Sequence, residues 1–467
     1  MEPGEVPAEL QNSGGDSEKE SLPKMSTEPE AWFEENLNKK PKEDTLCSRK
    51  KTDNECLFGP LRGFPDDIKK YMATKPPDLG DSCIHFSQFG KCQYWVTCRF
   101  AGAHLGEGYQ NVVNEELWKK WEGKSAVRNM LMIPDSRDKI LRDFPFTKSS
   151  DYLSCLEKVK NKAAPPVKKK VPPDSTLKRI GVLTDEDLIR LRPCEKRKLD
   201  LQGKLYLSPI AKCGSLPFRR ICKRFGADIT CGEMLCCVLS KNQIPGVTPC
   251  LHRHETEDLF GIQLQGMAPT PMIRYGELLN ETSQVDFVDI NAEYLESATL
   301  MKRSIHFEQI VRGMDYVLDV PLTVKLRTVL FPVYRAALIK PWIFTEIKER
   351  RHWDISARER LDILKDLTNY GLEYWGSDMI GVEKTRYSLL NWLSFLCRYI
   401  PVGLLEHLPP KMTDQHPGVL YGDYLENLMS SQMIKDWVKI SEMFLGTVPD
   451  YYRFTPAHKI DKYFIQT

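Results

Sequence analysis

The chain has 467 residues, a length that corresponds to roughly two to four domains. Its composition, with 41% hydrophobic residues, 28% charged residues and a formal net charge of +2, is that of a folded globular chain and excludes a wholly disordered one. No apolar run is long enough to span a bilayer, and the N-terminal MEPGEVPAEL lacks the basic and apolar regions of a secretion signal, so we expect an intracellular protein, cytoplasmic and/or nuclear.

Composition divides the chain into five segments. We expect a disordered acidic tail over residues 1–45, where acidic residues outnumber basic ones, and a Cys-, Gly- and Phe-rich region over 46–105. Residues 106–203 contain KVKNKAAPPVKKKVPP and are predicted to be a basic, Pro-containing linker. Strand-like and helix-like stretches alternate over 204–342, and 343–467 is predicted to be helical throughout.

The strongest chemical motif is Cys83, Cys92, Cys98 and His104, with the spacing C-x8-C-x5-C-x5-H. Three thiolates and one imidazole fill a tetrahedral shell and suit zinc, and the fourteen cysteines of an intracellular chain are expected to be thiols or metal ligands. The alternative is a chance cluster of reduced cysteines. Upstream, Cys47 and Cys56 repeat the x8 spacing, but Arg62 and Asp66 stand where the other two ligands would be. We therefore predict one degenerate finger and one intact finger.

Aromatic residues alternate with basic residues inside the intact finger. This mixture suits single-stranded RNA, whose bases stack on rings and whose phosphates pair with cations. The alternative is that the rings only cover the zinc. The rings concerned are Phe86, Phe89, Tyr94, Trp95 and Phe100.

Five strands are predicted between residues 204 and 342, at 204–211, 227–234, 259–266, 285–291 and 321–327, with helices at 215–226, 271–280 and 306–319 between them. This alternation predicts an α/β fold with a parallel sheet, and ligands of such folds gather at the carboxyl ends of the strands. Those ends carry Pro209 and Ile210, Gln263, Asn291 and Lys325, which would suit a planar, anionic cofactor. The alternative is a wet rim whose polar residues serve solubility.

The C-terminal segment begins a helix with the capping box Ser356-x-x-Glu359. Leu389, Leu393, Leu396 and Ile400 recur at helical spacing and are expected to be core residues. Lys384, Arg386 and Arg398 are candidates for phosphate contacts, although helix surfaces carry such charges routinely.

The segments LYLSPIAKCGSLPFRRICKRFGADITCGEM, GIQLQG, VDFVDIN and PLTVKLR, preceded by the Cys/His finger, resemble the tRNA-dihydrouridine synthases, in particular the eukaryotic zinc-finger branch that modifies uridine 47 in the tRNA variable loop. The resemblance implies a flavin-bearing (β/α)8 barrel followed by a helical tRNA-binding domain. It also implies a reaction in which NADPH reduces FMN, the flavin gives a hydride to a flipped uridine, and a cysteine supplies the proton.

By this resemblance Pro209, Ile210, Gln263, Asn291 and Lys325 are the flavin contacts, and Cys83, Cys92, Cys98 and His104 are the zinc ligands. Zinc, FMN and NADPH are the implied cofactors and tRNA is the implied partner, with no obligate protein partner visible.

The chain departs from the family pattern in two places. After Asn291 the family has Gly-Cys-Pro, whereas this chain has AEYLESATLM, so the catalytic cysteine is missing and Tyr294 stands at or near its position. VKLRT then passes directly into VLFPVYRAALIKPWIF without the stretch that holds the flavin phosphate. Leu205 to Trp342 is 138 residues, against about 250 for a typical complete barrel.

We therefore expect a truncated (β/α)8 flavin barrel with little or no activity. The alternatives are an active uridine reductase, a non-catalytic zinc- and RNA-binding protein, and a degenerate copy without a settled function.

Overall fold

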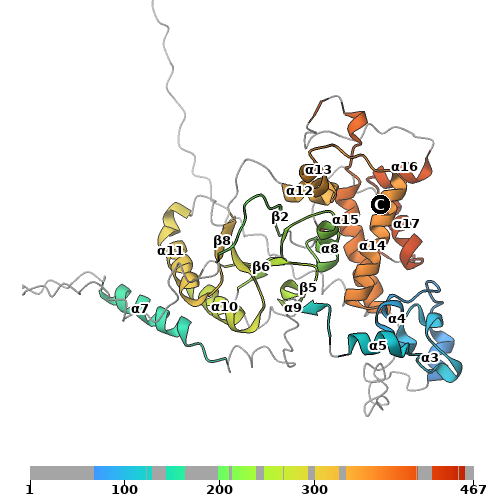
Figure 1. Cartoon of the computed structure of the whole chain (residues 1–467), viewed down its shortest axis with the longest axis horizontal. Helices are drawn as coiled ribbons and strands as arrows, with labels where there is room; N and C mark the ends of the chain where they lie inside the picture. The colour runs from blue at the N-terminus through green and yellow to red at the C-terminus, as the bar shows by residue number, and fades with distance from the viewer. Residues whose placement is uncertain are drawn as a thin grey trace, which may run out of the picture.

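The computed structural model describes residues 68–122, 124–128, 144–162, 198–209, 213–237, 247–266, 268–292, 300–325, 333–405, 407–408, 423–450 and 452–457. Cys47 and Cys56, Ile210 and Tyr294 lie outside these residues. Two regions stand side by side in Figure 1, a parallel sheet with its helices and a C-terminal helical bundle with the finger beneath it.

The sheet has six parallel strands in the order β2-β3-β6-β7-β8, with β4 beside β6. Along β2-β3-β6-β7-β8 the strands lie side by side in the order in which they occur in the chain. This winding is that of a barrel, since the strand order of a doubly wound sheet reverses. All five strands predicted from the sequence are therefore present. Their bounds are β2 Tyr206–Leu207, β3 Ile229–Cys231, β4 Leu235–Cys236, β6 Leu259–Gln265, β7 Phe287–Asn291 and β8 Leu322–Lys325.

One face of this sheet packs on helices. The side chains that alternate outward along the strands, such as Phe260, Ile262 and Val288, are buried against α10 (Pro269–Thr282) and α11 (Leu300–Val317). The helix α7 (Lys148–Lys162) lies against α10 and α11, although its residues fall within the predicted linker. The predicted linker, residues 106–203, also contains β1 (Val127–Arg128), which pairs antiparallel with β5 (Arg253–His254) of the sheet region.

The C-terminal part of the chain is helical, as predicted. Its core is formed by α14 and α15, which pack on each other and on α8. The capping box forms at Ser356, whose side chain accepts from Glu359 N while the Glu359 carboxylate accepts from Ser356 N, and α14 begins there. The helices of the barrel region that complete its description are α8 Leu216–Arg224, α9 Val247–Leu251 and α12 Val333–Ile339. The helices of the C-terminal part are α13 Ile343–Glu349, α14 Ala357–Trp375, α15 Met379–Leu396, the short 3-10 helix η8 Val402–Leu404, α16 Tyr424–Ser430 and α17 Ile434–Leu445.

The finger is built from short helical turns. A single hydrophobic cluster includes Cys83, Cys92 and Cys98 together with residues of α14, α15 and α8, so the finger and the bundle share one core. The elements are α3 Ile68–Thr74, α4 Ile84–Phe89, η3 Trp95–Thr97, η4 Ala101–Ala103, η5 Glu107–Tyr109 and α5 Glu115–Trp121.

The position of α12 reveals which part of a barrel is present. This helix contacts β2, the first strand of the sheet, and α15. Only residues 326–332 separate β8 from α12, whereas one β/α unit with its next strand takes about 30 residues. The described residues therefore form a parallel half-barrel, with β2, β3, β6, β7 and β8 side by side in chain order and α12 packed on the first of them, which confirms the predicted truncated barrel. No described helix combines the length and apolar character that a membrane span requires.

Candidate functional site

Cys83, Cys92, Cys98 and His104 come together as the sequence predicted. Their ligand atoms lie within 4.8 Å of one another, and all four residues are buried. Three of the ligands flank short helical turns: Cys83 precedes α4, Cys98 ends η3 and His104 ends η4. Gly90, with φ of +76°, ends α4 in the left-handed conformation, and a Cβ there would lie 2.5 Å from Asn114 O.

The donor set fits a zinc ion. His104 Nδ1 donates to Asn111 Oδ1 at 3.0 Å, and Asn111 Nδ2 donates to Cys92 O at 2.8 Å, which fixes the orientation of the amide. Nδ1 of His104 then carries the proton, and its buried Nε2 is left as an acceptor without a hydrogen-bond partner among the described residues. The cluster therefore presents three thiols and one imidazole nitrogen without a partner among the described residues, which is the donor set of a Cys3His zinc site.

Three aromatic residues of the finger, Phe86, Tyr94 and Phe100, pack in the same hydrophobic cluster as the cysteines. Trp95 packs with Tyr71 and Val96 instead, and the Phe89 ring meets Trp121. For the first three rings the structure favours the alternative in which they cover the metal site. A ring that the sequence reasoning missed is more accessible: Trp118 of α5 is 41% exposed, with Lys91 Nζ 5.6 Å from its ring centre.

A second polar cluster lies on the inner face of the sheet at its carboxyl ends. Asn291 Nδ2 lies 3.4 Å from Gln263 Oε1, and Asn291 pairs in register with Lys325. Gln263 and Asn291 are buried, and Lys325 is half-buried. Gln263, Asn291 and Lys325 therefore lie next to one another on neighbouring strands, as predicted. Pro209 is buried just beyond the end of β2.

Asp289 is a member of this cluster that the sequence reasoning missed. Its carboxylate accepts from Gln263 Nε2 at 2.7 Å and from Thr323 Oγ1 at 2.6 Å. Burial raises the pKa of Asp289, and the hydrogen bonds from Thr323 and Gln263 offset part of that rise. Because Gln263 Nε2 is committed to Asp289, its Oε1 points toward Asn291. The signal available in the sequence was the i, i+2 spacing of Asp289 and Asn291, which places both on one face of a strand.

The candidate cofactor face holds no exposed thiol among the described residues. Cys231 lies in β3, on the same inner face, and is buried with Ile229 and Phe287. Burial raises the pKa of the Cys231 thiol, which is the opposite of what an activated cysteine needs. Cys237 is also buried.

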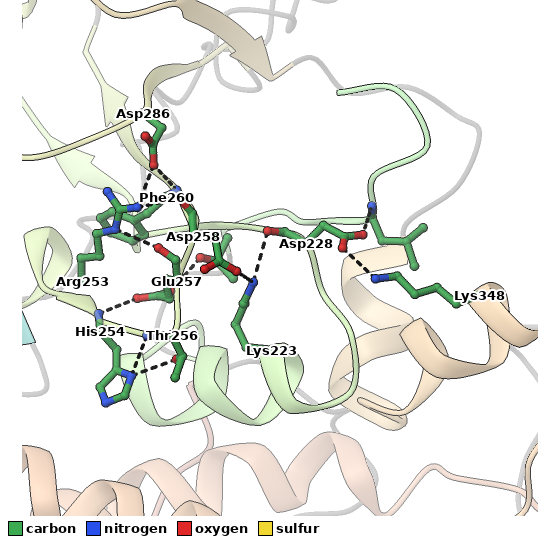
Figure 2. Close-up of polar contacts among 12 residues, drawn as sticks. Lys223, Asp228, Arg253, His254, Thr256, Glu257, Asp258, Phe260, Asp286 and Lys348 are labelled. Atoms are coloured by element: carbon green, nitrogen blue, oxygen red, sulfur yellow. Dashed lines mark hydrogen bonds and ion pairs between the residues drawn. The ribbon is translucent and has the colours of Figure 1, made fainter. Parts of the chain in front are cut away.

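A different polar network lies at the amino ends of the strands (Figure 2). In it, aspartates that directly precede strands accept hydrogen bonds from backbone amides and form ion pairs with basic side chains. Asp286 Oδ2 accepts from Phe260 N at 2.9 Å and pairs with Arg253 at 2.9 Å. Asp228 Oδ2 accepts from Leu205 N at 2.9 Å, and its Oδ1 pairs with Lys348. These contacts join neighbouring strands and helices, so we assign this end to stability, as expected for the amino end of a barrel.

Glu257 lies at the centre of that end. Arg219 Nε donates to it at 2.8 Å and Thr230 Oγ1 at 2.7 Å, and the Arg219 and Glu257 side chains are both almost fully buried. Burial alone would raise the pKa of Glu257, but the Arg219 guanidinium lowers it below its ordinary value.

Arg386, one of the candidates for phosphate contacts, has a structural role instead. Its guanidinium is buried and donates to Ser441 Oγ at 2.9 Å and Leu445 O at 2.7 Å. It therefore caps the carboxyl end of α17. Lys384 and Arg398 are exposed and remain accessible to a ligand.

Comparison with known proteins agrees with this geometry. The sequence profile described as "Dihydrouridine synthase (Dus)" matches residues 206–338, from β2 to α12. A Xenopus tropicalis protein named tRNA-dihydrouridine(47) synthase NAD(P)(+)-like is 44% identical, over 88% of this chain and 79% of its own length. Proteins with the same name from Homo sapiens and Arabidopsis thaliana are 42% and 35% identical, over 88% of this chain and 79% and 83% of their own lengths.

The lengths of these alignments are informative. The alignment with the Xenopus tropicalis protein has 502 positions, whereas 88% of this 467-residue chain is about 411 residues, so about 90 positions have no residue of this chain. A gap of this size fits the shortened half-barrel. Sequence identity, coverage and the profile match together place this chain in the dihydrouridine synthase family.

Proposed function

We propose that this chain is a tRNA-binding homologue of the tRNA-dihydrouridine(47) synthases with little or no reductase activity of its own. One observation carries the proposal: the parallel sheet passes from β8 to the closing helix α12 through residues 326–332 alone. The family acts on tRNA with FMN and NADPH. The proposal keeps the RNA partner and the zinc centre, and places the protein in the cytoplasm or nucleus.

The inner-face cluster fits the ring side of the flavin. Gln263, Asn291 and Lys325 would hold the ring, and bound FMN would supply the hydride for reduction of the base. Asp289 fixes the amide of Gln263, so that its oxygen remains directed at the carboxyl edge. The sequence passes from VKLRT directly into VLFPVYRAALIKPWIF, without the stretch that holds the flavin phosphate in complete family members, so we expect weak FMN retention.

The proton donor is the second deficit. The sequence after Asn291 is Ala-Glu-Tyr, without cysteine, and a tyrosine such as Tyr294 has an ordinary pKa of about 10 against about 8.5 for a thiol. Loss of a positioned general acid costs about 10²–10⁴-fold in rate. Together with weak FMN retention, this supports activity far below that of a complete family member.

The finger and the helical bundle support tRNA binding. They share one hydrophobic core, and each carries basic residues that RNA phosphates could pair with. Lys91 with the exposed Trp118 offers a cation beside a stacking ring, and Lys384 and Arg398 are exposed on the bundle. This observation favours an RNA-binding protein over a degenerate copy.

The test is direct. Unmodified tRNA is incubated with the purified protein, FMN and NADPH, and dihydrouridine is quantified by mass spectrometry beside a complete family member. We expect at most about 1% of the turnover of that enzyme, because the general acid is absent. Turnover at the level of the complete enzyme would overturn the proposal. Tyr294→Phe is the matched variant, since it keeps the ring and removes only the hydroxyl.

Binding is measured separately, by titrating the same tRNA in the absence of FMN. Micromolar or tighter binding with turnover below that limit supports a non-catalytic RNA-binding protein. Absence of both binding and turnover would contradict the proposed function and favour a degenerate copy.

A further inference from the structure

The junction between α14 and α15 lies directly against the Cys3His cluster. Ser377, which stands between the two helices, is fully buried. Its Oγ lies 3.1 Å from Cys98 Sγ and 3.8 Å from Cys92 Sγ. A polar hydroxyl in a fully buried position requires a hydrogen-bond partner, and the two thiols are the partners that the structure gives it.

We propose that Ser377 belongs to the metal centre, as the residue of the helical bundle whose hydroxyl donates to the Cys98 ligand. A cysteine that ligates zinc is a thiolate and can only accept a hydrogen bond, so the proton of this contact comes from Ser377 Oγ. The hydrogen bond withdraws charge from the Cys98 sulfur and orients it, which is how residues around a metal stabilise its ligands.

The backbone at Ser377 is tied to the finger next to Cys98. Arg99 N, the amide next to Cys98, donates to Ser377 O at 2.8 Å. The Arg99 guanidinium continues along the junction and donates to Met379 Sδ at 2.7 Å. Arg99 thus holds the peptide that follows Cys98 against the segment from Ser377 to Met379.

Two further contacts fix the end of α14 on the finger. His85 Nε2 donates to Leu372 O at 3.0 Å. Gly376 ends α14 with φ of +109°, and a Cβ there would lie 2.5 Å from the Tyr94 ring. The chain therefore turns at Gly376 while the Tyr94 ring occupies the space of a side chain, and this close approach brings Ser377 onto the cluster.

The consequence is thermodynamic linkage between zinc and the bundle. A structural metal contributes its binding free energy to the fold that forms its site. Because Ser377 lies in the α14–α15 junction, that fold includes the bundle as well as the finger. Loss of zinc should loosen the start of α15 and the end of α14, in addition to the finger itself.

The first experiment compares Ser377→Ala with Ser394→Ala. Ser394 is also buried in the bundle, but its hydroxyl donates to Asn391 O within its own helix at 2.7 Å. Zinc affinity is measured by competition with a chromogenic chelator. We expect Ser377→Ala to weaken zinc binding by about 10–100-fold, the usual effect of removing a hydrogen bond to a ligand, and Ser394→Ala to leave it unchanged.

Substitution of the native metal with cobalt(II) gives a readout that a purely structural serine would not move. The sulfur-to-cobalt charge-transfer band should shift in Ser377→Ala, because the thiolate loses its hydrogen bond, and should stay in place in Ser394→Ala. Equal zinc affinities and identical cobalt spectra for the two variants would overturn the inference.

A measurement on the unaltered protein is independent of how the variants fold. Amide hydrogen exchange is followed with zinc bound and after chelation. We expect faster exchange after chelation over residues 372–382, and no change in α11, which lies outside the shared core. Unchanged exchange over 372–382 would contradict the linkage. A purified protein without zinc would instead show that the assignment of the cluster itself is wrong.

Discussion

The carboxylate of Glu277 in α10 accepts hydrogen bonds from the first turn of α7. The Glu277→Gln variant tests how much these hydrogen bonds stabilise α7. The carboxylate accepts from Thr147 N at 3.0 Å, Lys148 N at 2.9 Å and Ser149 N at 3.0 Å, and also from the two hydroxyls of Thr147 and Ser149. These amides begin a helix and have no partner within it, so one buried carboxylate from α10 caps α7 from outside. In Glu277→Gln one oxygen becomes an NH2 group, which cannot accept.

The magnitude follows from the hydrogen bonds that the substitution removes. Each hydrogen bond to a charged group contributes about 1.5–3 kcal/mol, and a negative charge at a helix start adds about 0.3–1 kcal/mol. At least two of these bonds disappear in Glu277→Gln, but the backbone donors recover part of the stabilisation in water once α7 opens. We expect a net cost of about 2–3 kcal/mol, or roughly 30- to 150-fold in the opening equilibrium of α7.

The assay is hydrogen exchange over α7 at pH 7, with Glu281→Gln as the matched control. Glu281 lies one turn further along α10, is 49% exposed at its side chain, and pairs with Lys148 at 3.4 Å. An exposed pair contributes little, so this control should change exchange only slightly. Equal exchange of α7 in the two variants would refute the capping role of Glu277.

The pH dependence adds a second check. Burial alone would raise the pKa of Glu277, but the hydrogen bonds from Ser149, Lys148 and Thr147 lower it below its ordinary 4.5. A lowered folded pKa means that the stabilisation is fully present above pH 4.5 and is lost as the pH falls through the folded value. The difference in urea unfolding between wild type and Glu277→Gln should therefore shrink below about pH 4. A difference that stays constant down to about pH 3 would contradict this assignment.

Three further outcomes are expected. Elemental analysis should find one zinc per chain, and Cys92→Ser should lose it, because three ligands remain; two zincs per chain would mean that Cys47 and Cys56 also bind metal. Affinity for tRNA should fall about tenfold or more between 50 and 200 mM salt, as counterion release requires, and an unchanged dissociation constant would exclude a phosphate-based surface. In urea titrations Glu257→Ala should lower the free energy of unfolding by about 3–5 kcal/mol, because Arg219 is left buried without its partner; a change below about 1 kcal/mol would show that water replaces the carboxylate.

Short-range sequence patterns were sufficient to predict the local elements and the Cys/His cluster. Alternation of apolar residues with helix signals predicted five of the six strands that the structure describes in the barrel sheet, and β6 and β7 match the predicted runs closely. The Cys and His spacing predicted the metal cluster, and the capping box predicted the start of α14. These features succeed because side-chain periodicity, ligand type and helix capping act between residues that are close in the chain.

The way in which distant segments use these residues depends on the tertiary structure. Ser377 lies 279 residues beyond Cys98, yet its hydroxyl contacts the Cys98 sulfur. Glu277 lies 128 residues beyond Ser149, yet its carboxylate accepts from the Ser149 amide at the start of α7. The same packing placed Phe100 in the core that the finger shares with the bundle and made Arg386 a helix cap. The periodicity of a sequence indicates that a residue is buried. It does not indicate which residue packs against it, because that depends on which elements approach each other in three dimensions.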